Sequence, residues 1–205
     1  GPVWTDGTIE QTKTALADAF PIPGNWGPAQ VIATCQAHLP EDALITADSG
    51  AHRILLSQMW RCGVPRALMQ SSGFCTMGCA VPLAICAQIA EPRRTAVSFP
   101  GERGFLMVAG ELATAAELGL RTIFVVFVDA SLALIDLKQR QRQMRNRGVD
   151  FAHTDFAAIA QAFGGIGVSV RSKSELEAAL AAAQRSDRFT LIAAETDKGA
   201  YDGAF

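Results

Sequence analysis

The stretch "TIFVVFV", residues 122–128, consists of seven β-branched or aromatic residues without a break. Residues of these types favour the extended backbone of a strand. Because the run is apolar on both of its faces, it belongs in a parallel sheet that helices cover on both sides. We therefore predict a buried strand at this position, in the centre of its sheet.

Outward from this run, the chain alternates short apolar stretches with segments of helical spacing. Five further strands are predicted at residues 43–47, 67–71, 95–99, 165–170 and 189–195. Helices are predicted at residues 29–39, 52–60, 77–90, 104–120, 155–163 and 173–184, and in a segment after Asp129. We expect Pro82 in the first turn of its helix, and Ser172 or Ser174 at the start of the last helix.

Strands that alternate with helices in this way define the α/β class. We predict a doubly wound parallel sheet of about six strands, with helices on both faces and the 104–120 helix packed on one of them. The basic run "KQRQRQMRNR", residues 138–147, is interpreted as the solvated face of a helix rather than a substrate clamp.

The first 28 residues differ from the rest, because they hold four of the nine prolines. The stretch "FPIPGNWGP", residues 20–28, predicts an extended linker arm, and Gly1-Pro2 is interpreted as a remnant of cloning. Residues 29–205 are then expected to form one domain, which is long enough to bury a substantial core.

The composition excludes several classes of protein. A net charge of −2 indicates neither a nucleic-acid binder nor a membrane-surface protein, and no apolar run is long enough to span a bilayer. No signal-peptide pattern opens the chain, so we expect a cytoplasmic protein. The five cysteines include Cys75 and Cys79 at helical spacing, but no second pair follows, which favours reduced, packed thiols over a metal site.

Polar and small residues follow four of the predicted strands. These are Asp48 to His52, the stretch "SSGFCTMG" at 71–78, "PGERG" at 100–104 and "DAS" at 129–131. In an open parallel sheet, ligands bind beyond the carboxyl ends of the strands. The four turns are therefore where we expect a ligand site, although α/β proteins commonly place small residues there.

Four collinear stretches carry a more specific signal: "ADSGAHRILLSQMW" (47–60), "SSGFCTMGCAVPLAICAQIA" (71–90), "GERGFLMVAGELATAAELGL" (101–120) and "FVVFVDASLALIDLKQ" (124–139). In order and spacing they resemble the C-terminal diphosphate-binding domain of thiamine-diphosphate-dependent enzymes, of the acetolactate synthase, benzaldehyde lyase and 2-hydroxyacyl-CoA lyase type. The similarity covers roughly residues 27–200. It implies the thiamine-diphosphate-binding fold and makes residues 29–205 the diphosphate-binding domain.

In that family a Gly-Asp-Gly motif, followed after about 26 residues by Asn-Asn or Asn-Asp, holds Mg²⁺ against the cofactor's diphosphate. The resemblance implies Glu102, Asp129 and Ser131 as metal ligands, the last through its backbone carbonyl. It places Ala51 and His52 beside the diphosphate. The carbonyl of Cys75 would face the cofactor's 4′-amino group, and Met77 would lie under the aminopyrimidine ring.

The chain departs from this pattern at contact positions. Gly101-Glu102-Arg103 replaces Gly-Asp-Gly, Val128 replaces the first Asn, and Cys75 stands where the family has Gly. Glu for Asp displaces the metal-binding carboxylate by about a bond length, although metal–oxygen distances tolerate only a few tenths of an ångström. These departures predict weakened binding of thiamine diphosphate and Mg²⁺.

Arg103 allows two interpretations. It could pair with the cofactor's diphosphate and take over part of the metal's work. Alternatively, it could pair with Glu102 or Asp129 and fill the site with an internal salt bridge.

The resemblance implies the diphosphate-binding half of a lyase, decarboxylase or carboligase that acts on 2-oxo or 2-hydroxy acids. In the family, a glutamate from a separate pyrimidine-binding domain activates the cofactor, so no catalytic residue is assigned to this chain. We expect a pyrimidine-binding domain or subunit as partner, a homo- or hetero-oligomer, and no turnover by the isolated chain. The alternative is a non-catalytic domain that keeps the fold for assembly or regulation.

Overall fold

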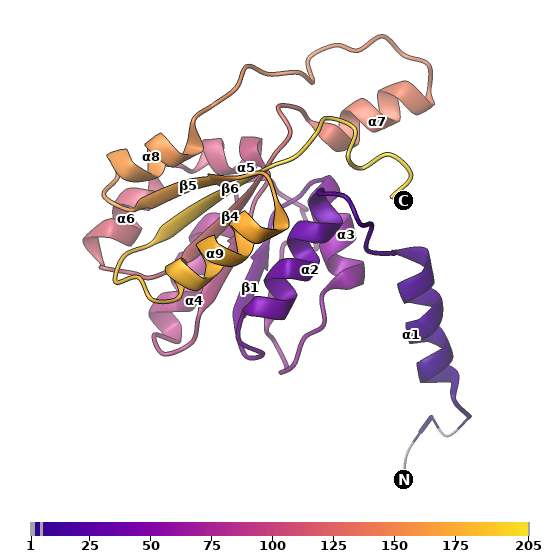
Figure 1. Ribbon diagram of the computed structural model, residues 1–205, viewed down its shortest axis with the longest axis horizontal. Helices are drawn as coiled ribbons and strands as arrows, with labels where there is room; N and C mark the ends of the chain where they lie inside the picture. The colour runs from indigo at the N-terminus through magenta and orange to yellow at the C-terminus, as the bar shows by residue number, and fades with distance from the viewer. Residues whose placement is uncertain (1–2, 5, 205) are drawn as a thin grey trace.

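The computed structural model describes residues 3–4 and 6–204, so the expected cloning remnant Gly1-Pro2 lies outside the described residues. Its core is one parallel sheet in the strand order β2-β1-β3-β4-β6-β5 (Figure 1). The strands are β1 (Leu44–Ala47), β2 (Leu68–Gln70), β3 (Ala96–Phe99), β4 (Ile123–Val128), β5 (Ile166–Val170) and β6 (Thr190–Glu195). The predicted doubly wound sheet is confirmed, and each predicted strand is present with its ends shifted by at most one residue.

The run that opened the sequence analysis lies between β3 and β6, and every residue of β4 is buried. Alternate side chains enter different cores, as the two-residue period of a strand requires. Ile123, Val125 and Phe127 pack in one core, whereas Phe124, Val126 and Val128 pack in the other. A strand that must be apolar on both faces is therefore the central strand of this fold.

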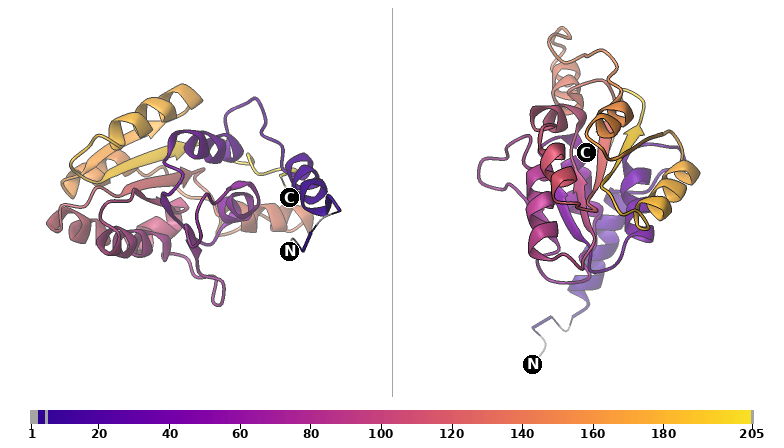
Figure 2. Two further views of the ribbon diagram at one scale, coloured as in Figure 1. Left: turned by 90° about the horizontal axis from the view of Figure 1, so that it is seen from below. Right: turned by 90° about the vertical axis from the view of Figure 1, so that its left-hand side faces the viewer.

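One face of the sheet is covered by α2 (Pro28–His38), α3 (Ala51–Met59) and α9 (Lys173–Ala183). The other is covered by α4 (Ala80–Ala90), α5 (Glu102–Met107), α6 (Glu111–Glu117) and α8 (Phe156–Ala162). Figure 2 shows the sheet between these two layers. As predicted, Pro82 lies in the first turn of α4, and the Ser172 hydroxyl caps α9 by accepting a hydrogen bond from the Glu175 amide.

The prediction of one helix at 104–120 is wrong, because two short helices, α5 and α6, replace it. The break lies at Val108–Gly110, where Val108 leaves the helical region at φ −133° and ψ 18°. Gly110 disfavours a continuous helix by about 1 kcal/mol relative to Ala. Both helices pack on the same core, through Phe105 and Leu112.

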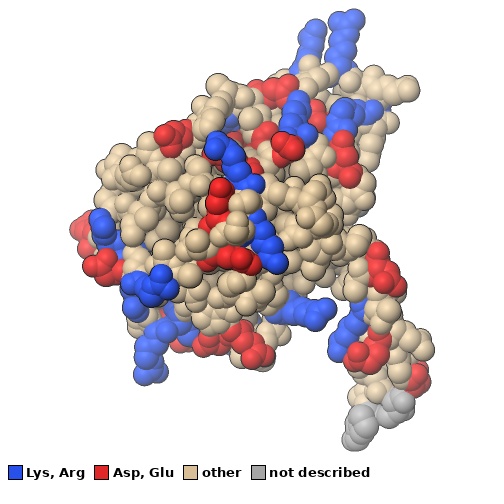
Figure 3. Space-filling model, viewed as in Figure 1, with Lys and Arg blue, Asp and Glu red and all other residues tan. Residues whose placement is uncertain are grey.

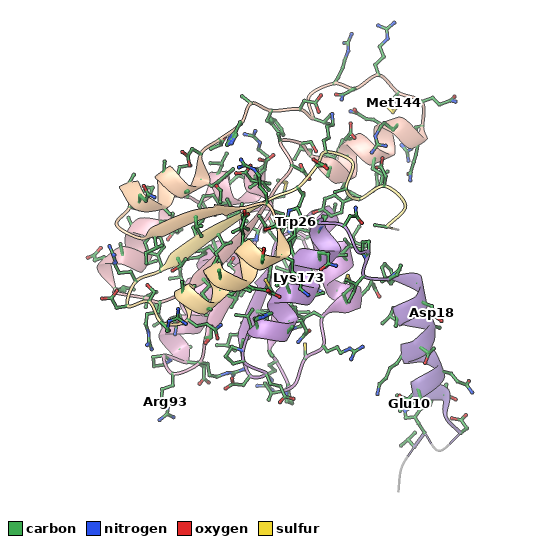
Figure 4. The ribbon with its side chains drawn as sticks, viewed as in Figure 1. Glu10, Asp18, Trp26, Arg93, Met144 and Lys173 are labelled. Atoms are coloured by element: carbon green, nitrogen blue, oxygen red, sulfur yellow. The ribbon has the colours of Figure 1, made fainter. Side chains whose placement is uncertain are left out.

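The basic run 138–147 is only partly helical. The helix α7 (Ala133–Gln141) ends inside it, and residues 142–147 form an exposed turn and loop. The interpretation as a helix face therefore holds for the first four residues of the run and is wrong for the rest. In Figure 4, Met144 marks this loop at the outer end of α7.

The N-terminal arm contains a helix that the sequence analysis did not predict. Helix α1 (Thr8–Ala19) buries none of its residues, and it lies apart from the body of the molecule, with Glu10 and Asp18 on it (Figure 4). Its sequence lacks Pro and Gly and is rich in good helix formers, which explains the helix. The arm first contacts the sheet domain at Trp26, whose indole N–H donates a 2.7 Å hydrogen bond to the Glu195 carbonyl. The boundary at residue 28 remains a prediction.

The prediction of packed thiols holds for Cys35, which is buried, and is wrong for Cys62, Cys75 and Cys86, which are exposed; all of the cysteines are free. On the surface drawn in Figure 3, cationic and anionic side chains are interspersed rather than gathered by sign. Among the described residues, no helix is both long enough and apolar enough to cross a membrane.

Candidate cofactor site

The topology creates a crevice where the chain reverses its direction of winding. The chain runs from β1 to β2 on one side and then places β3 on the other side of β1, so the turns after β1 and β3 diverge. A pocket of about 170 Å³ lies at this end of the sheet. The turns after β1, β3 and β4 line it, together with Met77, the start of α7 and Tyr201.

Two carboxyl groups enter the pocket from neighbouring turns. Glu102, the first residue of α5, is only 3% exposed, and its Oε1 has no hydrogen-bond partner among the described residues. Burial and the nearby charge of Asp129 raise the pKa of Glu102 to about 7, although Arg103 opposes the shift. The Glu102 carboxyl therefore keeps its proton to a higher pH than an exposed glutamate does.

The turn after β4 holds the second carboxyl group in place. The Asp129 Oδ1 atom accepts hydrogen bonds from the backbone N–H and the hydroxyl of Ser131, both at 2.8 Å. This turn requires a left-handed backbone at Ala130, with φ +54°. Burial raises the pKa of Asp129, and its hydrogen bonds with Ser131 offset part of that shift.

Arg103 forms a long ion pair with Glu102 that is not a hydrogen bond. Its Nε is 3.9 Å from Glu102 Oε1, beyond hydrogen-bond distance, and this Nε also has no partner among residues 3–4 and 6–204. Its guanidinium carbon lies 3.5 Å from the centroid of the Phe151 ring. The Phe151 amide in turn donates to the Ala130 carbonyl at 2.9 Å, which fixes the ring next to the Asp129 turn.

His52 contributes a third unsatisfied polar atom to the same pocket. Its side chain is 4% exposed, stacks on Phe127 with ring centroids 5.1 Å apart, and leaves Nε2 without a partner in the described part of the chain. Burial lowers the pKa of His52 to about 4, so the ring is neutral at neutral pH. Of the eight buried side-chain polar atoms that lack a partner within the described chain, three belong to residues that line this pocket, which makes it the candidate ligand site.

Asp48 joins three of the turns around the pocket. It is fully buried, and its carboxylate accepts hydrogen bonds from the amides of Gly78 at 2.9 Å and Cys79 at 3.0 Å, just before α4. Gly104 packs directly on this carboxylate, where a Cβ atom would overlap Asp48 Oδ2. The sequence indicated Asp48 as part of a site turn but not this structural role.

The C-terminal segment after β6 closes one side of the pocket. Tyr201 is buried there, and its pKa is raised by burial and by the charge of Asp129. Two hydrogen bonds from Arg140 to Asp202, and an ion pair between Lys198 and Asp150, attach this segment to α7 and to the loop that follows it. No motif near Tyr201 indicated a site, so sequence reasoning missed it.

The structure brings together seven of the eight site residues that were named from the sequence. The lining of the pocket includes Ala51, His52, Met77, Glu102, Arg103, Asp129 and Ser131. Cys75 does not line it: its side chain is exposed, and its Sγ accepts a 3.4 Å hydrogen bond from Arg53. Cys75 has φ +48°, a left-handed backbone that explains why glycine suits this position.

Comparison with known proteins decides the family. Residues 48–194 match the family model of the thiamine pyrophosphate enzyme C-terminal TPP binding domain, where TPP is thiamine pyrophosphate, the same compound as thiamine diphosphate. The chain belongs to this family. This TPP-binding domain is of the acetolactate synthase type, because its relatives include synthases of that name.

The catabolic acetolactate synthase of Raoultella terrigena is 32% identical over 170 residues, which cover 83% of this chain and 30% of the synthase. The acetolactate synthase of Bacillus subtilis is 30% identical over 173 residues, which cover 82% of this chain and 30% of the synthase. This TPP-binding domain thus spans about 30% of the length of the curated relatives it matches.

A solved structure has the same fold. The thiamine diphosphate-dependent 4-hydroxybenzoylformate decarboxylase of Rhodococcus jostii RHA1 superposes with a TM-score of 0.79, at 20% sequence identity. The match covers 86% of this chain and 34% of the decarboxylase. At this identity the likeness establishes the fold of the domain and not its activity.

Proposed function

We propose that this chain is the diphosphate-binding half of a thiamine-diphosphate-dependent lyase, decarboxylase or carboligase that acts on 2-oxo or 2-hydroxy acids. The single observation that carries the proposal is the pocket at the switch point of the sheet, where unsatisfied polar atoms of His52, Glu102 and Arg103 converge beside Asp129. The family and its acetolactate synthase relatives support the same assignment.

The pocket suits the diphosphate better than it suits a divalent cation. The Arg103 side chain, which is 23% exposed, lines the pocket and offers its positive charge to an anionic group. For Mg²⁺ the donors would be the carboxylates of Glu102 and Asp129 and the Ser131 carbonyl. Among the described residues no three His, Cys, Asp or Glu gather as a metal site, and the Arg103 cation already lies 3.9 Å from Glu102 Oε1. We therefore propose a metal site that is altered and weakened.

Thiamine diphosphate, when bound, supplies a carbon nucleophile for the carbonyl group of a substrate. The residues of this chain would bind and orient it. Ala51 and His52, at the start of α3, would contact the diphosphate, and Met77 would support the aminopyrimidine ring. The Cys75 carbonyl would hold the 4′-amino group from the loop before α4. None of these residues is assigned a proton-transfer step.

The activating glutamate would come from a pyrimidine-binding domain or subunit, within a homo- or hetero-oligomer in the cytoplasm. Exposed apolar side chains near the pocket support a partner: Phe74 is 97% exposed and Met107 is 65% exposed. Without that partner, the purified 205-residue chain should show no decarboxylase or carboligase turnover on pyruvate. Measurable turnover by the chain alone would overturn this part of the proposal.

The test is calorimetric titration of thiamine diphosphate in the presence of Mg²⁺. Each lost metal contact could cost on the order of a few kcal/mol, and about 1.4 kcal/mol is a tenfold change in affinity. The wild-type chain should therefore show little Mg²⁺-dependent stabilisation by the cofactor. The triple variant Glu102→Asp, Arg103→Gly, Val128→Asn should show a clear Mg²⁺-dependent gain. If the folded triple variant binds no thiamine diphosphate, the proposed function is wrong.

The second candidate is a non-catalytic domain that serves assembly or regulation. The substitutions Glu102, Arg103 and Val128 favour it, because they fall together at the metal and diphosphate positions while the scaffold is retained. A chain of this kind would associate with a pyrimidine-binding partner and bind no cofactor with or without Mg²⁺. The same titration therefore separates the two functions.

A further inference from the structure

The Arg103 guanidinium stacks on an aromatic ring, and its Nε–H donates no hydrogen bond within the described residues. Its guanidinium lies on the Phe151 ring, with 3.5 Å between Cζ and the ring centroid. Stacking of this kind uses the flat face of the guanidinium and leaves its in-plane N–H groups available. Because the Phe151 amide bonds to the Ala130 carbonyl, the ring that supports Arg103 is attached to the turn that carries Asp129.

Arg103 and Glu102 form only a long ion pair, without the hydrogen bonds of a salt bridge that would fill the site. If Arg103 closed such a bridge with Glu102, their polar atoms would meet near 2.8 Å, as charged hydrogen bonds do. Instead Arg103 Nε and Glu102 Oε1 are 3.9 Å apart, and neither atom has a hydrogen-bond partner among the described residues. The Arg103 side chain is also 23% exposed and lines the pocket, so a ligand can reach it.

We infer that Arg103 is a diphosphate ligand that supplies the positive charge a divalent metal would otherwise supply, so that this pocket binds a diphosphate group without metal. This inference rests on the proposed function and deepens it. The planar guanidinium can present two parallel N–H groups to two phosphate oxygens, which an ammonium group cannot do. Phe151 acts as a positioning residue that keeps the guanidinium beside the pocket.

The test measures binding of inorganic diphosphate by calorimetry, with a chelator present to remove divalent metals. The wild-type chain should bind, and Arg103→Met should lose about tenfold to hundredfold in affinity, as expected for charged hydrogen bonds. Arg103→Lys should be intermediate, since it retains the charge without the fork. Phe151→Ala should weaken binding severalfold, because it leaves the charge in place but removes the support. Thermal unfolding of each variant confirms that it is folded.

Arg121→Met is the matched control. Arg121 is exposed and precedes β4, so it lies at the opposite edge of the sheet from the pocket, and its loss should leave diphosphate binding unchanged. Equal losses for Arg121→Met and Arg103→Met would show only a general effect of net charge and would overturn the inference. Unchanged or tighter binding by Arg103→Met would overturn it as well.

The outcomes also separate this inference from the proposed function. If the wild-type chain binds no diphosphate without metal, while the triple variant binds thiamine diphosphate with Mg²⁺, the inference fails and the proposed function stands. If inorganic diphosphate binds through Arg103 but thiamine diphosphate binds to neither protein, the inference holds and the proposed function fails.

Discussion

Replacement of Gly104 by alanine should disrupt the packing of α5 on the Asp48 carboxylate, which connects the turns around the pocket. Gly104 is buried in α5 against the Asp48 carboxylate, and an added Cβ would overlap Asp48 Oδ2 and lie 3.0 Å from its Cγ and 3.2 Å from the Gly78 amide nitrogen. The carboxylate cannot move aside freely, because it accepts hydrogen bonds from the Gly78 and Cys79 amides.

The expected loss follows from these contacts. Insertion of one carbon into a well-packed core costs about 1–3 kcal/mol. Displacement of the carboxylate from even one amide costs about 1.5–3 kcal/mol more, because hydrogen bonds to charged groups are strong. Gly104→Ala should therefore lower the free energy of unfolding by about 2.5–6 kcal/mol, a large share of the roughly 5–15 kcal/mol typical of a domain.

Urea unfolding followed by circular dichroism measures this change, and Gly110→Ala is the control. Gly110 lies six residues further on, has φ −59°, and has no atom within 4 Å of an added Cβ. Its substitution should change the unfolding free energy by no more than about 1 kcal/mol. In an Asp48→Ala background, the further effect of Gly104→Ala should shrink, because the overlapping carboxylate is gone. A loss below about 1 kcal/mol for Gly104→Ala in the wild-type background would refute the reasoning.

Three further predictions follow from single residues. The pKa of Glu102 is raised from 4.5 in the unfolded chain to about 7 in the native state, so the native state binds this proton more tightly. The free energy of unfolding should therefore fall as pH rises from about 4.5 through about 7. Glu102→Gln should then be more stable than wild type by about 1–3 kcal/mol above that pH, with the gain vanishing below about pH 4.5; a gain that does not change with pH would contradict the assignment. Cys75→Gly should raise the free energy of unfolding, measured in urea, by about 1 kcal/mol, because φ is +48° at this exposed position. A decrease would contradict this prediction. The chain should self-associate or bind a dye for apolar surfaces through the region of Phe74 and Met107, and a monodisperse monomer at high concentration in light scattering, with no dye bound, would count against that.

The sequence was sufficient for the strands, because a strand's periodicity and composition are properties of neighbouring residues. The run at β4 had to be buried on both faces, and alternation of such runs with helices leaves few topologies besides the doubly wound parallel sheet. The turns at the carboxyl ends of the strands followed from the same argument. The resemblance to the family, rather than this argument, implied that Glu102 and Asp129, which are 27 positions apart, would share a site.

The helix predictions from sequence failed where local propensity and tertiary packing favour different structures. The Ala- and Leu-rich stretch 104–120 has strong helix propensity throughout, but the chain breaks at Val108–Gly110 so that α5 and α6 can each pack on the sheet. Residues 8–19 form a helix that the sequence analysis did not predict, although they contain no proline. Propensity over a short window does not report which packing arrangement will prevail.

Only the tertiary structure determined the partners inside the site. Asp48 bonds to amides 30 and 31 positions away, Tyr201 comes back to the pocket from the C-terminal end, and Phe151 places its ring under Arg103. From the residues alone, Arg103 could equally have paired with a carboxylate or with a ligand. That choice depends on a separation of 3.9 Å and on an aromatic ring from a distant loop, and such distances arise only when the chain returns to the same place in space.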